Sequence, residues 1–297
     1  MKKAKQVSVK LLRRVITFFG ADEVLSGWLG PDSKWRKAMP KPSYYSKEEY
    51  DFRLEKGLSL IIDRSDYTQW RIFSGSLAIN PHIVSLLNRK AHIVVMDIGA
   101  NIGAYSVLLA RSLKDHEMDI HLFEPNPYVF SRLQANVNQL RKWSQKVRCV
   151  SNQLGVGDRE YNLKLKFNRT HTGKATFVDQ DTFDEELEVP VVALDSYLEK
   201  QDIKQVDFIK LDVESFEPSV FLGAKQTIAK YRPLIYFEFS NKWFSNYSEE
   251  TISSLMDRFK DVGYRMNLEK GTGFKKFDFS LNNLKTIKYG NFLAVPD

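Results

Sequence analysis

Acidic side chains follow two short apolar runs in the second half of the chain. Lys210, Asp212 and Glu214 lie close together after the first run, and Glu238 ends the second. If these runs are neighbouring parallel strands, their carboxyl ends line one crevice. Carboxylates gathered there repel one another unless they bind a cation, bind ligand amines or share protons. These three acids are therefore candidates for a general base or for ligands of magnesium, with Lys210 offsetting one charge.

A structural role is the alternative for part of this acidic group. Glu214 and Glu217 precede Pro218 and a predicted helix, where acidic side chains complement the helix dipole. This role explains Glu217 well. It explains Asp212 and Glu238 less well, because both are expected at the crevice.

An earlier apolar run ends in an acid and enters a turn punctuated by glycines. Gly99 and Gly103 allow the backbone to turn tightly and to approach a ligand where a Cβ atom would collide. A predicted helix follows and points its N-terminal amides at polar groups of the ligand. Asp97 can accept hydrogen bonds, directly or through water, from a cationic amino group. The predicted cofactor contacts from this segment are Asp97, Gly99, Ala100, Asn101 and Gly103.

A second predicted strand ends in Glu124 and is stopped by Pro125. An acid at this position holds the two hydroxyls of a ribose. The NAD fingerprint G-x-G-x-x-G is incomplete, because Asn101 occupies its third position and Ala104 its sixth. A methyl donor therefore fits better than NAD. The predicted cofactor set is completed by Glu124, Pro125, Asn126, Asn152 at the end of a third strand, and Asp212.

From about residue 58 onward, short apolar runs alternate with amphipathic stretches, as in βα units around a parallel sheet. The stretch Arg159–Val192 departs from this rhythm and indicates extended strands or an inserted hairpin. The chain ends in a strand pattern. We predict strands at His92–Asp97, Asp119–Phe123, Val147–Asn152, Phe208–Asp212, Leu234–Phe239, Gly263–Leu268 and Asn291–Pro296. Helices are predicted at Ala104–Leu113, Tyr128–Leu140, Pro218–Lys230 and Thr251–Val262.

The composition is that of a chain able to bury a core. Its 297 residues are 43% hydrophobic and 13% aromatic, enough for one large α/β domain with an accessory segment. The net charge of +7 favours an anionic partner, such as an acidic glycan, a lipid surface or nucleic acid. The single cysteine, Cys149, excludes a disulfide framework or multi-thiolate zinc site and fits a reducing cytoplasm.

The N-terminal part of the chain differs from the rest. We expect residues 1–58 to form a partly helical accessory segment and residues 59–297 to form the α/β domain. No apolar run reaches the length of about 18 residues that crosses a bilayer. The basic amphipathic pattern of residues 2–19 fits a helix packed on its own domain or one that lies on a membrane surface. The protein is expected in the cytoplasm, with peripheral membrane contact as the alternative, and its oligomeric state is open.

Taken in order, the motifs of this chain resemble those of the FkbM family of methyltransferases. The resemblance covers roughly residues 65–296, and the combination is more specific than any single motif. One departure is Ser215-Phe216 between the two acids, where the family usually has glycine; serine can serve there as a helix N-cap. The matching segments are Asp97–Gly103, Phe123–Asn126, Leu194–Leu198, Asp207–Glu217, Phe221–Ala224, Arg232–Pro233 and Tyr236–Glu238.

The resemblance implies an α/β fold of the Rossmann-like class I methyltransferases, with a mostly parallel seven-stranded sheet and a C-terminal antiparallel strand. It also implies S-adenosylmethionine as cofactor and O-methylation of a hydroxyl on a sugar, glycolipid, polysaccharide or secondary metabolite. A hydroxyl acceptor must be held in line with the methyl group and must lose its proton. The predicted catalytic residues are Asp212, Glu214, Glu238 and Lys210. The three acids are the candidate bases, and a role for magnesium is left open.

Two other functions compete with this interpretation. Nucleic-acid methyltransferases that act on amino groups often carry an N/D-P-P-Y tetrad after the fourth strand, where this chain has the residues from Asp212 to Ser215. No RNA-binding module is recognisable, so nucleic acid is the less favoured partner. A non-catalytic S-adenosylmethionine-binding protein is the third possibility, and the full set of acids argues against such a loss of activity.

Overall fold

The computed structural model describes residues 13, 15–17, 21–28, 39–46, 48–75, 77–168, 175–178 and 183–297. The described residues up to Ala78 belong to one compact unit, and those from Ile79 onward belong to a second. The boundary expected at residues 58 and 59 therefore lies within the first unit. Most of the basic segment at residues 2–19, on which the membrane-surface alternative rests, lies outside the described residues.

The first unit is built on a β-hairpin rather than on helices alone. Strands β1 (Glu49–Glu55) and β2 (Leu58–Asp63) pair antiparallel, and Gly57 supplies the positive φ of +82° that the turn requires. Helix α3 (Tyr67–Phe73) follows, and the fully buried ring of Phe73 lies edge-on to aromatic rings of β1. The unit also contains α2 (Ala21–Trp28) and a short 3-10 turn (Pro42–Tyr44).

The second unit is organised around an eight-stranded sheet with the order β12-β11-β13-β10-β9-β3-β4-β5. The five strands from β10 to β5 are parallel, and β13 pairs antiparallel with β10 and with β11. The strands are β3 (His92–Ile98), β4 (Glu117–Phe123), β5 (Val147–Asn152), β9 (Phe208–Leu211), β10 (Leu234–Ser240), β11 (Tyr264–Lys270), β12 (Gly273–Lys276) and β13 (Tyr289–Pro296).

The mostly parallel sheet with an antiparallel C-terminal strand is therefore confirmed, with eight strands in place of seven. The additional strand is β12, which pairs with β11 through a tight hairpin. Gly271 adopts a φ of +61° in that hairpin turn, a conformation that costs glycine little. The strand is short and its residues are partly exposed, which left no apolar pattern in the sequence.

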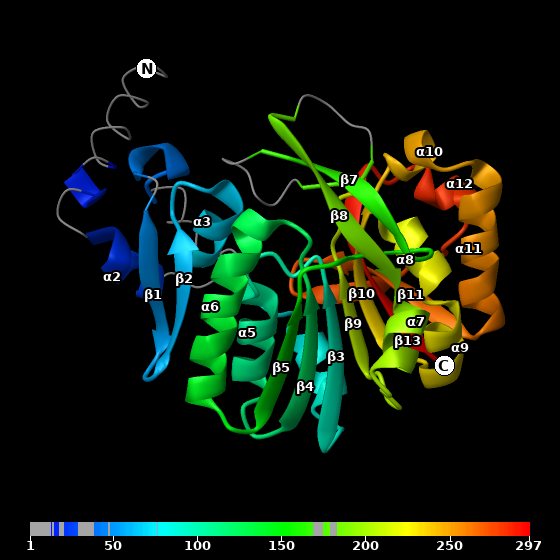
Figure 1. Cartoon of the computed structure of the whole chain (residues 1–297), viewed down its shortest axis with the longest axis horizontal. Coiled ribbons are helices and arrows are strands. Elements are labelled where there is room, and N and C mark those ends of the chain that lie inside the picture. Colours follow the sequence, from blue (N-terminus) through cyan, green and yellow to red (C-terminus); the bar gives the residue numbers. More distant parts are fainter. Residues whose placement is uncertain are drawn as a thin grey trace. The chain divides into compact units, whose positions relative to one another are not determined.

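Helices cover both faces of this sheet (Figure 1). Helices α5 and α6 lie beside each other along β3, β4 and β5, while α7, α8, α9 and α11 surround the other strands. The second group buries an extensive aromatic core, in which Phe221, Phe237 and Phe259 make edge-to-face contacts. The helices are α4 (Pro81–Leu87), α5 (Ala104–Ser112), α6 (Pro127–Trp143), α7 (Leu194–Lys200), α8 (Glu217–Gly223), α9 (Lys225–Tyr231), α10 (Trp243–Asn246), α11 (Glu249–Asp261) and α12 (Leu281–Leu284).

One predicted helix is divided in two. Residues 218–230 were expected to be continuous, but α8 ends at Gly223 and α9 begins at Lys225. A Cβ atom at Gly223 would lie 1.9 Å from the carbonyl oxygen of Gly157, so only glycine allows this backbone contact. The close packing of α8 against β6 (Gly155–Gly157) fixes where the first helix ends.

The stretch expected to hold an inserted hairpin forms a second, three-stranded sheet. Its order is β6-β8-β7, in which β7 (Tyr161–Phe167) and β8 (Glu185–Ala193) form the long antiparallel pair visible in Figure 1. The expected hairpin is therefore confirmed. Among the described residues of the chain, no helix is both long and apolar enough to cross a membrane.

Candidate functional site

Asp97 lies at the end of the central strand β3 and is completely buried. One carboxylate oxygen, Oδ2, accepts a hydrogen bond of 2.6 Å from the Ser106 hydroxyl on α5. The other, Oδ1, lies 3.3 Å from the Lys210 Nζ atom of the neighbouring strand β9. Lys210 also donates a 2.6 Å hydrogen bond to the Gly99 carbonyl oxygen. Lys210 is therefore held by Asp97 and by the glycine turn, and its charge is directed to the predicted cofactor side of the site.

The electrostatic setting of Lys210 keeps its ammonium group charged. Burial alone would lower its pKa, but the nearby carboxylates, first Asp97 and then Asp212, oppose this effect and raise the pKa above its ordinary value. A permanently charged lysine does not take up protons during a reaction. Lys210 is suited to fixing the charge and position of Asp97.

The two glycines of the turn are required for reasons internal to the protein. Gly99 has a φ of +76°, and a Cβ atom there would lie 1.9 Å from the Asp212 carbonyl oxygen. Gly103 has a φ of +78° and precedes α5, but its added Cβ would meet other atoms only at ordinary contact distances. Ala100 is buried, and its N–H joins that of Gly99 in donating to the Phe123 carbonyl oxygen. Within the protein itself, a side chain at Gly99 would therefore collide with the backbone after β9, and one at Gly103 would be disfavoured by the backbone conformation.

Glu124 follows β4 directly and links the glycine turn to the start of α6. Its Oε2 atom accepts a 2.9 Å hydrogen bond from the Asn101 N–H, and its Oε1 atom accepts one of the same length from the Asn126 N–H. Burial raises the pKa of Glu124 to about 7, although these two N–H groups favour the charged form. Each oxygen retains a second lone pair for a hydroxyl donor. Pro125 lies between Glu124 and Asn126 and follows the end of the strand.

Asn126 and Asn152 occupy different positions at this edge of the sheet. Asn126 caps α6, since its Oδ1 atom accepts from the Tyr128 N–H, while its buried Nδ2 atom has no partner among the described residues. Asn152 donates from Nδ2 to the Leu122 carbonyl oxygen and accepts from the Tyr197 hydroxyl. Asn126 thus retains a donor for a ligand, whereas both polar atoms of the Asn152 side chain already bind the protein.

These residues fit an adenosyl ligand with a cationic amino group. Within the described chain, the buried Asn126 Nδ2 atom and Tyr105 hydroxyl have no hydrogen-bond partner, and Asp97 Oδ1 has only its ion pair with Lys210 Nζ at 3.3 Å. Buried polar atoms are normally satisfied, so two acceptors or donors at the predicted cofactor positions point to a polar ligand. Glu124 adds the lone pairs that suit a ribose diol.

The three predicted catalytic acids converge on one place. Asp212, Glu214 and Glu238 each offer a carboxylate oxygen, and the three oxygens lie within 4.8 Å of one another. Asp212 follows β9 and Glu238 belongs to the adjacent strand β10, so parallel pairing brings their carboxyl ends together. Such a cluster of hard oxygen donors is able to hold a divalent cation or to share a proton.

The clustering of the three acids changes the pKa of Glu238. Its pKa is raised from 4.5 to about 9, first by burial and then by the charges of Asp212 and Glu214. The Tyr289 hydroxyl of β13 donates a hydrogen bond to Glu238 Oε1. At neutral pH, Glu238 is therefore protonated in the protein without a bound cation. Tyr289 was not predicted, because its partner lies 51 positions away and only the β10–β13 pairing brings them together.

The turn that carries Glu214 has an uncommon backbone. Glu214 and Ser215 both have positive φ values, +53° and +78°, at a cost of about 1–2 kcal/mol for each residue other than glycine. Ser215 is not the helix N-cap that the sequence suggested: Phe216 occupies that position, and α8 begins at Glu217. The missing family glycine is thus replaced by a serine in a conformation that favours glycine.

Glu217 is the first residue of helix α8, where the structural alternative placed it, and its carboxylate also makes hydrogen bonds to neighbouring elements. This fully buried side chain accepts hydrogen bonds from the Val213 N–H at 3.0 Å and from the Trp243 indole N–H at 2.9 Å. Burial raises its pKa to about 7. Its two carboxylate oxygens therefore fix the turn after β9 to α10.

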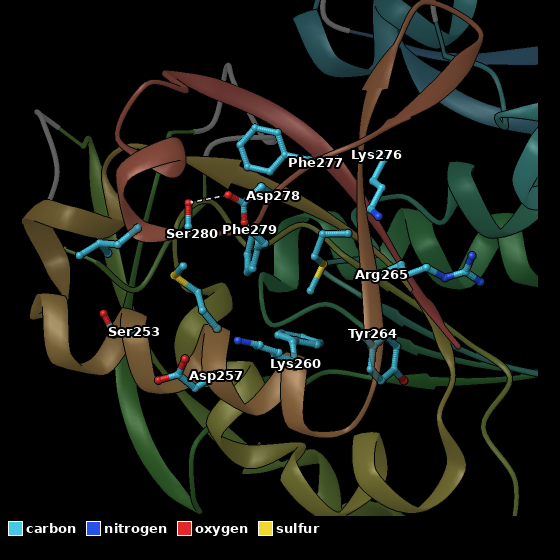
Figure 2. A pocket seen from close by; sticks show the side chains of 14 residues that line it. Ser253, Asp257, Lys260, Tyr264, Arg265, Lys276, Phe277, Asp278, Phe279 and Ser280 are labelled. Atoms are coloured by element: carbon cyan, nitrogen blue, oxygen red, sulfur yellow. Dashed lines mark hydrogen bonds between the residues drawn. The ribbon is translucent and has the colours of Figure 1, made fainter.

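The structure also contains a groove that none of these acids lines (Figure 2). Its volume is about 960 Å³, and Figure 2 shows Asp257, Lys260 and Asp278 among the side chains around it. The groove lies between α11 and β11, on the sheet face covered by α11, whereas Glu238 points to the other face. It is therefore separate from the candidate site.

Comparison with known proteins gives an independent assignment. Residues 97–266 match the family model described as the methyltransferase FkbM domain. A protein of Sinorhizobium fredii (strain NBRC 101917 / NGR234) named 2-O-methyltransferase NoeI is 28% identical over 183 residues, covering 57% of this chain and 72% of that protein. The 31-O-demethyl-FK506 methyltransferase FkbM of Streptomyces tacrolimicus is 29% identical over 156 residues. That match covers 44% of this chain and 59% of the relative.

Solved structures include a similar protein under the same family name. The methyltransferase FkbM from Methylobacillus flagellatus KT is 15% identical, with a TM-score of 0.45, and the match covers 94% of this chain and 59% of that one. The family match spans more than half of the chain and includes the glycine turn, Glu124 and the acidic cluster. The chain therefore belongs to the FkbM family of S-adenosylmethionine-dependent methyltransferases, with their Rossmann-like class I fold.

Proposed function

We propose that this protein transfers a methyl group from S-adenosylmethionine to a hydroxyl group of a small molecule or glycan. Both curated relatives carry names of O-methyltransferases. The observation that carries the proposal is the convergence of Asp212, Glu214 and Glu238 within 4.8 Å at the carboxyl end of the sheet. A hydroxyl acceptor must lose a proton, and this cluster offers the groups to receive it.

The cofactor is assigned to the residues around the glycine turn. Asp97 Oδ1 would accept from the amino group, Glu124 from the ribose hydroxyls, and Asn126 Nδ2 would donate to the ligand. When bound, S-adenosylmethionine supplies an electrophilic methyl group on a positively charged sulfur. Lys210 and Ser106 hold the Asp97 carboxylate in place by contacts of 3.3 and 2.6 Å, so this acceptor is fixed before the ligand arrives.

We assign to Asp212 the role of the base that receives the hydroxyl proton of the acceptor. Glu238 already holds a proton at neutral pH, because its pKa is raised to about 9. Asp212 lies one residue beyond β9, and its backbone packs so closely on Gly99 of the cofactor turn that an added Cβ at Gly99 would lie 1.9 Å from the Asp212 carbonyl oxygen. During methylation of the acceptor oxygen, the Asp212 carboxylate would receive the hydroxyl proton.

A divalent cation is the alternative use of the same acids. Magnesium prefers carboxylate oxygens, and a bound cation would displace the proton of Glu238 and lower the pKa of an acceptor hydroxyl. We propose the carboxylate-base form of the reaction. The two forms differ in one direct respect, because only the cation form loses its activity when a chelator is added.

The test is the release of S-adenosylhomocysteine with a panel of acceptors that carry sugar, lipid or small-molecule hydroxyls, with RNA as a comparison. We expect release with a hydroxyl acceptor, at least about a hundredfold loss in Asp212→Asn, and no effect of EDTA. Asp257→Asn, which removes an acid from the separate groove of Figure 2, serves as the matched control. Release only with RNA would favour a nucleic-acid methyltransferase. Binding of S-adenosylhomocysteine without turnover of any acceptor would favour a non-catalytic binder.

A further inference from the structure

The turn between β9 and α8 holds Glu214 in a conformation that its own residues disfavour. Both central residues, Glu214 and Ser215, have positive φ, the pattern of a type I′ turn, in which glycine and asparagine are preferred. The Phe216 N–H donates to the Val213 carbonyl oxygen at 3.3 Å across this turn. A turn of these residue types requires support from outside itself.

Thr176, in the segment between β7 and β8, supplies such a contact. Its hydroxyl donates a 2.7 Å hydrogen bond to the Glu214 carbonyl oxygen. The same hydroxyl accepts a 3.2 Å hydrogen bond from the Val178 N–H, which orients its proton toward Glu214. Thr176 is 2% exposed, so water does not compete with this bond.

The position of Thr176 is fixed by two further sets of contacts. Its N–H and carbonyl group exchange hydrogen bonds of 2.9 Å with Lys166 of β7, which makes it part of the second sheet. The next residue, Phe177, places its ring 5.1 Å from the ring of Phe216 and packs on the backbone of Gly155. The segment is therefore anchored on both sides of the turn that carries Glu214.

We propose that Thr176 is a positioning residue that keeps Glu214 within the carboxylate cluster by holding the left-handed backbone of Glu214 and Ser215. This role rests on the proposed function of the cluster in proton removal. Thr176 touches neither cofactor nor acceptor; it acts through the Glu214 carbonyl group. The segment between the inserted strands β7 and β8 thereby becomes a part of the active centre through the hydrogen bond of the Thr176 hydroxyl group.

The activity test compares Thr176→Val, which keeps the shape but loses the hydroxyl, with Thr176→Ser, which keeps the hydroxyl. We expect kcat to fall at least about tenfold in the valine variant, with KM for S-adenosylmethionine unchanged, and to remain near the parent value in the serine variant. Thr286→Val is the matched control, because the exposed Thr286 hydroxyl also donates to a backbone carbonyl oxygen, at 2.7 Å. Equal losses in the valine and serine variants, or no loss in the valine variant, would overturn the proposal.

A second substitution tests the backbone part of the argument. Ser215→Gly removes the steric cost of the positive φ, so the turn no longer depends on Thr176. We expect Ser215→Gly to restore most of the kcat lost in Thr176→Val, and to allow that variant to fold if the single substitution does not. A folded double variant without restored kcat would contradict the role of Thr176.

A readout without turnover separates this proposal from the proposed function. The groups that act on the Glu238 carboxyl are Asp212, Glu214 and Glu217 by charge and Tyr289 by hydrogen bond, and only Glu214 lies in the contact with Thr176. Titration of Glu238 by ¹³C NMR should give a lower pKa in Thr176→Val than in the parent protein, and no change in Thr176→Ser. If no acceptor is methylated, the proposed function fails while this titration still tests Thr176. An unchanged Glu238 pKa in the valine variant would refute the positioning role in either case.

Discussion

Glu238 should make the protein less stable as the pH rises, and the substitution Glu238→Gln should remove this part of the pH dependence. In the folded protein its pKa is raised to about 9, against 4.5 for a free side chain. Between these values the folded state binds a proton that the unfolded state has released. Stability from this group is therefore complete at low pH and is lost as the pH rises toward 9. Glu238→Gln keeps the shape and the hydrogen-bonding capacity of the protonated acid without its titration.

The expected magnitude follows from linkage. Each pH unit over which only the folded protein is protonated lowers the free energy of unfolding by about 1.4 kcal/mol. Between about pH 5 and about pH 8, the free energy of unfolding should therefore fall by about 2–4 kcal/mol because of Glu238. The lower part of this range allows for the contact of the side chain with solvent, which weakens the charge repulsion. Glu124 and Glu217, whose pKa values are raised to about 7, add their own fall. The contribution of Glu124 is the same in both proteins and cancels in the difference, whereas that of Glu217 cancels only in part because its charge acts on Glu238.

The assay is urea unfolding across this pH range, with EDTA present and with tryptophan fluorescence as the signal. Trp243 is fully buried and bonded to Glu217, so it reports on unfolding of this region. The free energy of unfolding should fall less with pH in Glu238→Gln than in the parent protein. Glu117→Gln, an exposed acid at the opposite end of the sheet, should leave the parent slope unchanged. If parent and Glu238→Gln differ in slope by less than about 0.5 kcal/mol over the range, the raised pKa of Glu238 is refuted.

Three further outcomes follow from the site. Glu124→Gln should weaken S-adenosylhomocysteine binding at least about tenfold in calorimetry, because it removes the carboxylate that we propose accepts from both ribose hydroxyls; unchanged affinity would refute that assignment. Gly99→Ala should destabilise the protein by more than about 3 kcal/mol in urea unfolding, since its Cβ would lie 1.9 Å from the Asp212 carbonyl oxygen. Lys210→Met should cost about 3–5 kcal/mol because it leaves the buried Asp97 unpaired, and adding Asp97→Asn should recover more than half of that loss.

Most of the second unit could be predicted from the sequence, because β3 and β9 are buried along nearly their whole length and β4, β10 and β11 bury alternate residues. Strands of these two kinds appear in the sequence as apolar runs or as apolar residues at every second position, and all seven predicted strands belong to the main sheet. The hairpin of β1 and β2 was not predicted, since β1 mixes charged and aromatic residues and its burial depends on pairing. The break between α8 and α9 was also missed, because it depends on contact of Gly223 with Gly157, 66 positions earlier.

The candidate site also contains features that the sequence predicted and contacts that it did not predict. The order of strands brings Asp212 and Glu238 together, as their places at strand ends predicted. The partners of Lys210 could not be predicted, because they depend on the register between two strands that are far apart in the sequence. In the structure, β3 and β9 pair so that Lys210 lies opposite Asp97. Thr176 lay beyond prediction for a different reason: its contact with Glu214 joins residues 38 positions apart through an irregular segment. Motifs indicate which residues take part, whereas only the fold gives their partners.

The charged residues at the carboxyl end of the sheet form two groups, the Lys210–Asp97 ion pair and the cluster of Asp212, Glu214 and Glu238. Lys210 is committed to Asp97 and the Gly99 carbonyl oxygen, so the cofactor side has its own balanced pair. On the proposed acceptor side, burial and repulsion from Asp212 and Glu214 raise the pKa of Glu238 to about 9, so that its carboxyl keeps a proton at neutral pH. That proton and a bound cation compete for the same oxygens, since each relieves the same repulsion. If the cluster works as a base, activity should survive the proton on Glu238 at neutral pH; if it works through a cation, activity should require its removal. If the cluster holds a cation, the pH dependence of turnover should therefore follow the loss of the Glu238 proton that the pH dependence of stability reports. If Asp212 is the base, turnover should not follow that loss.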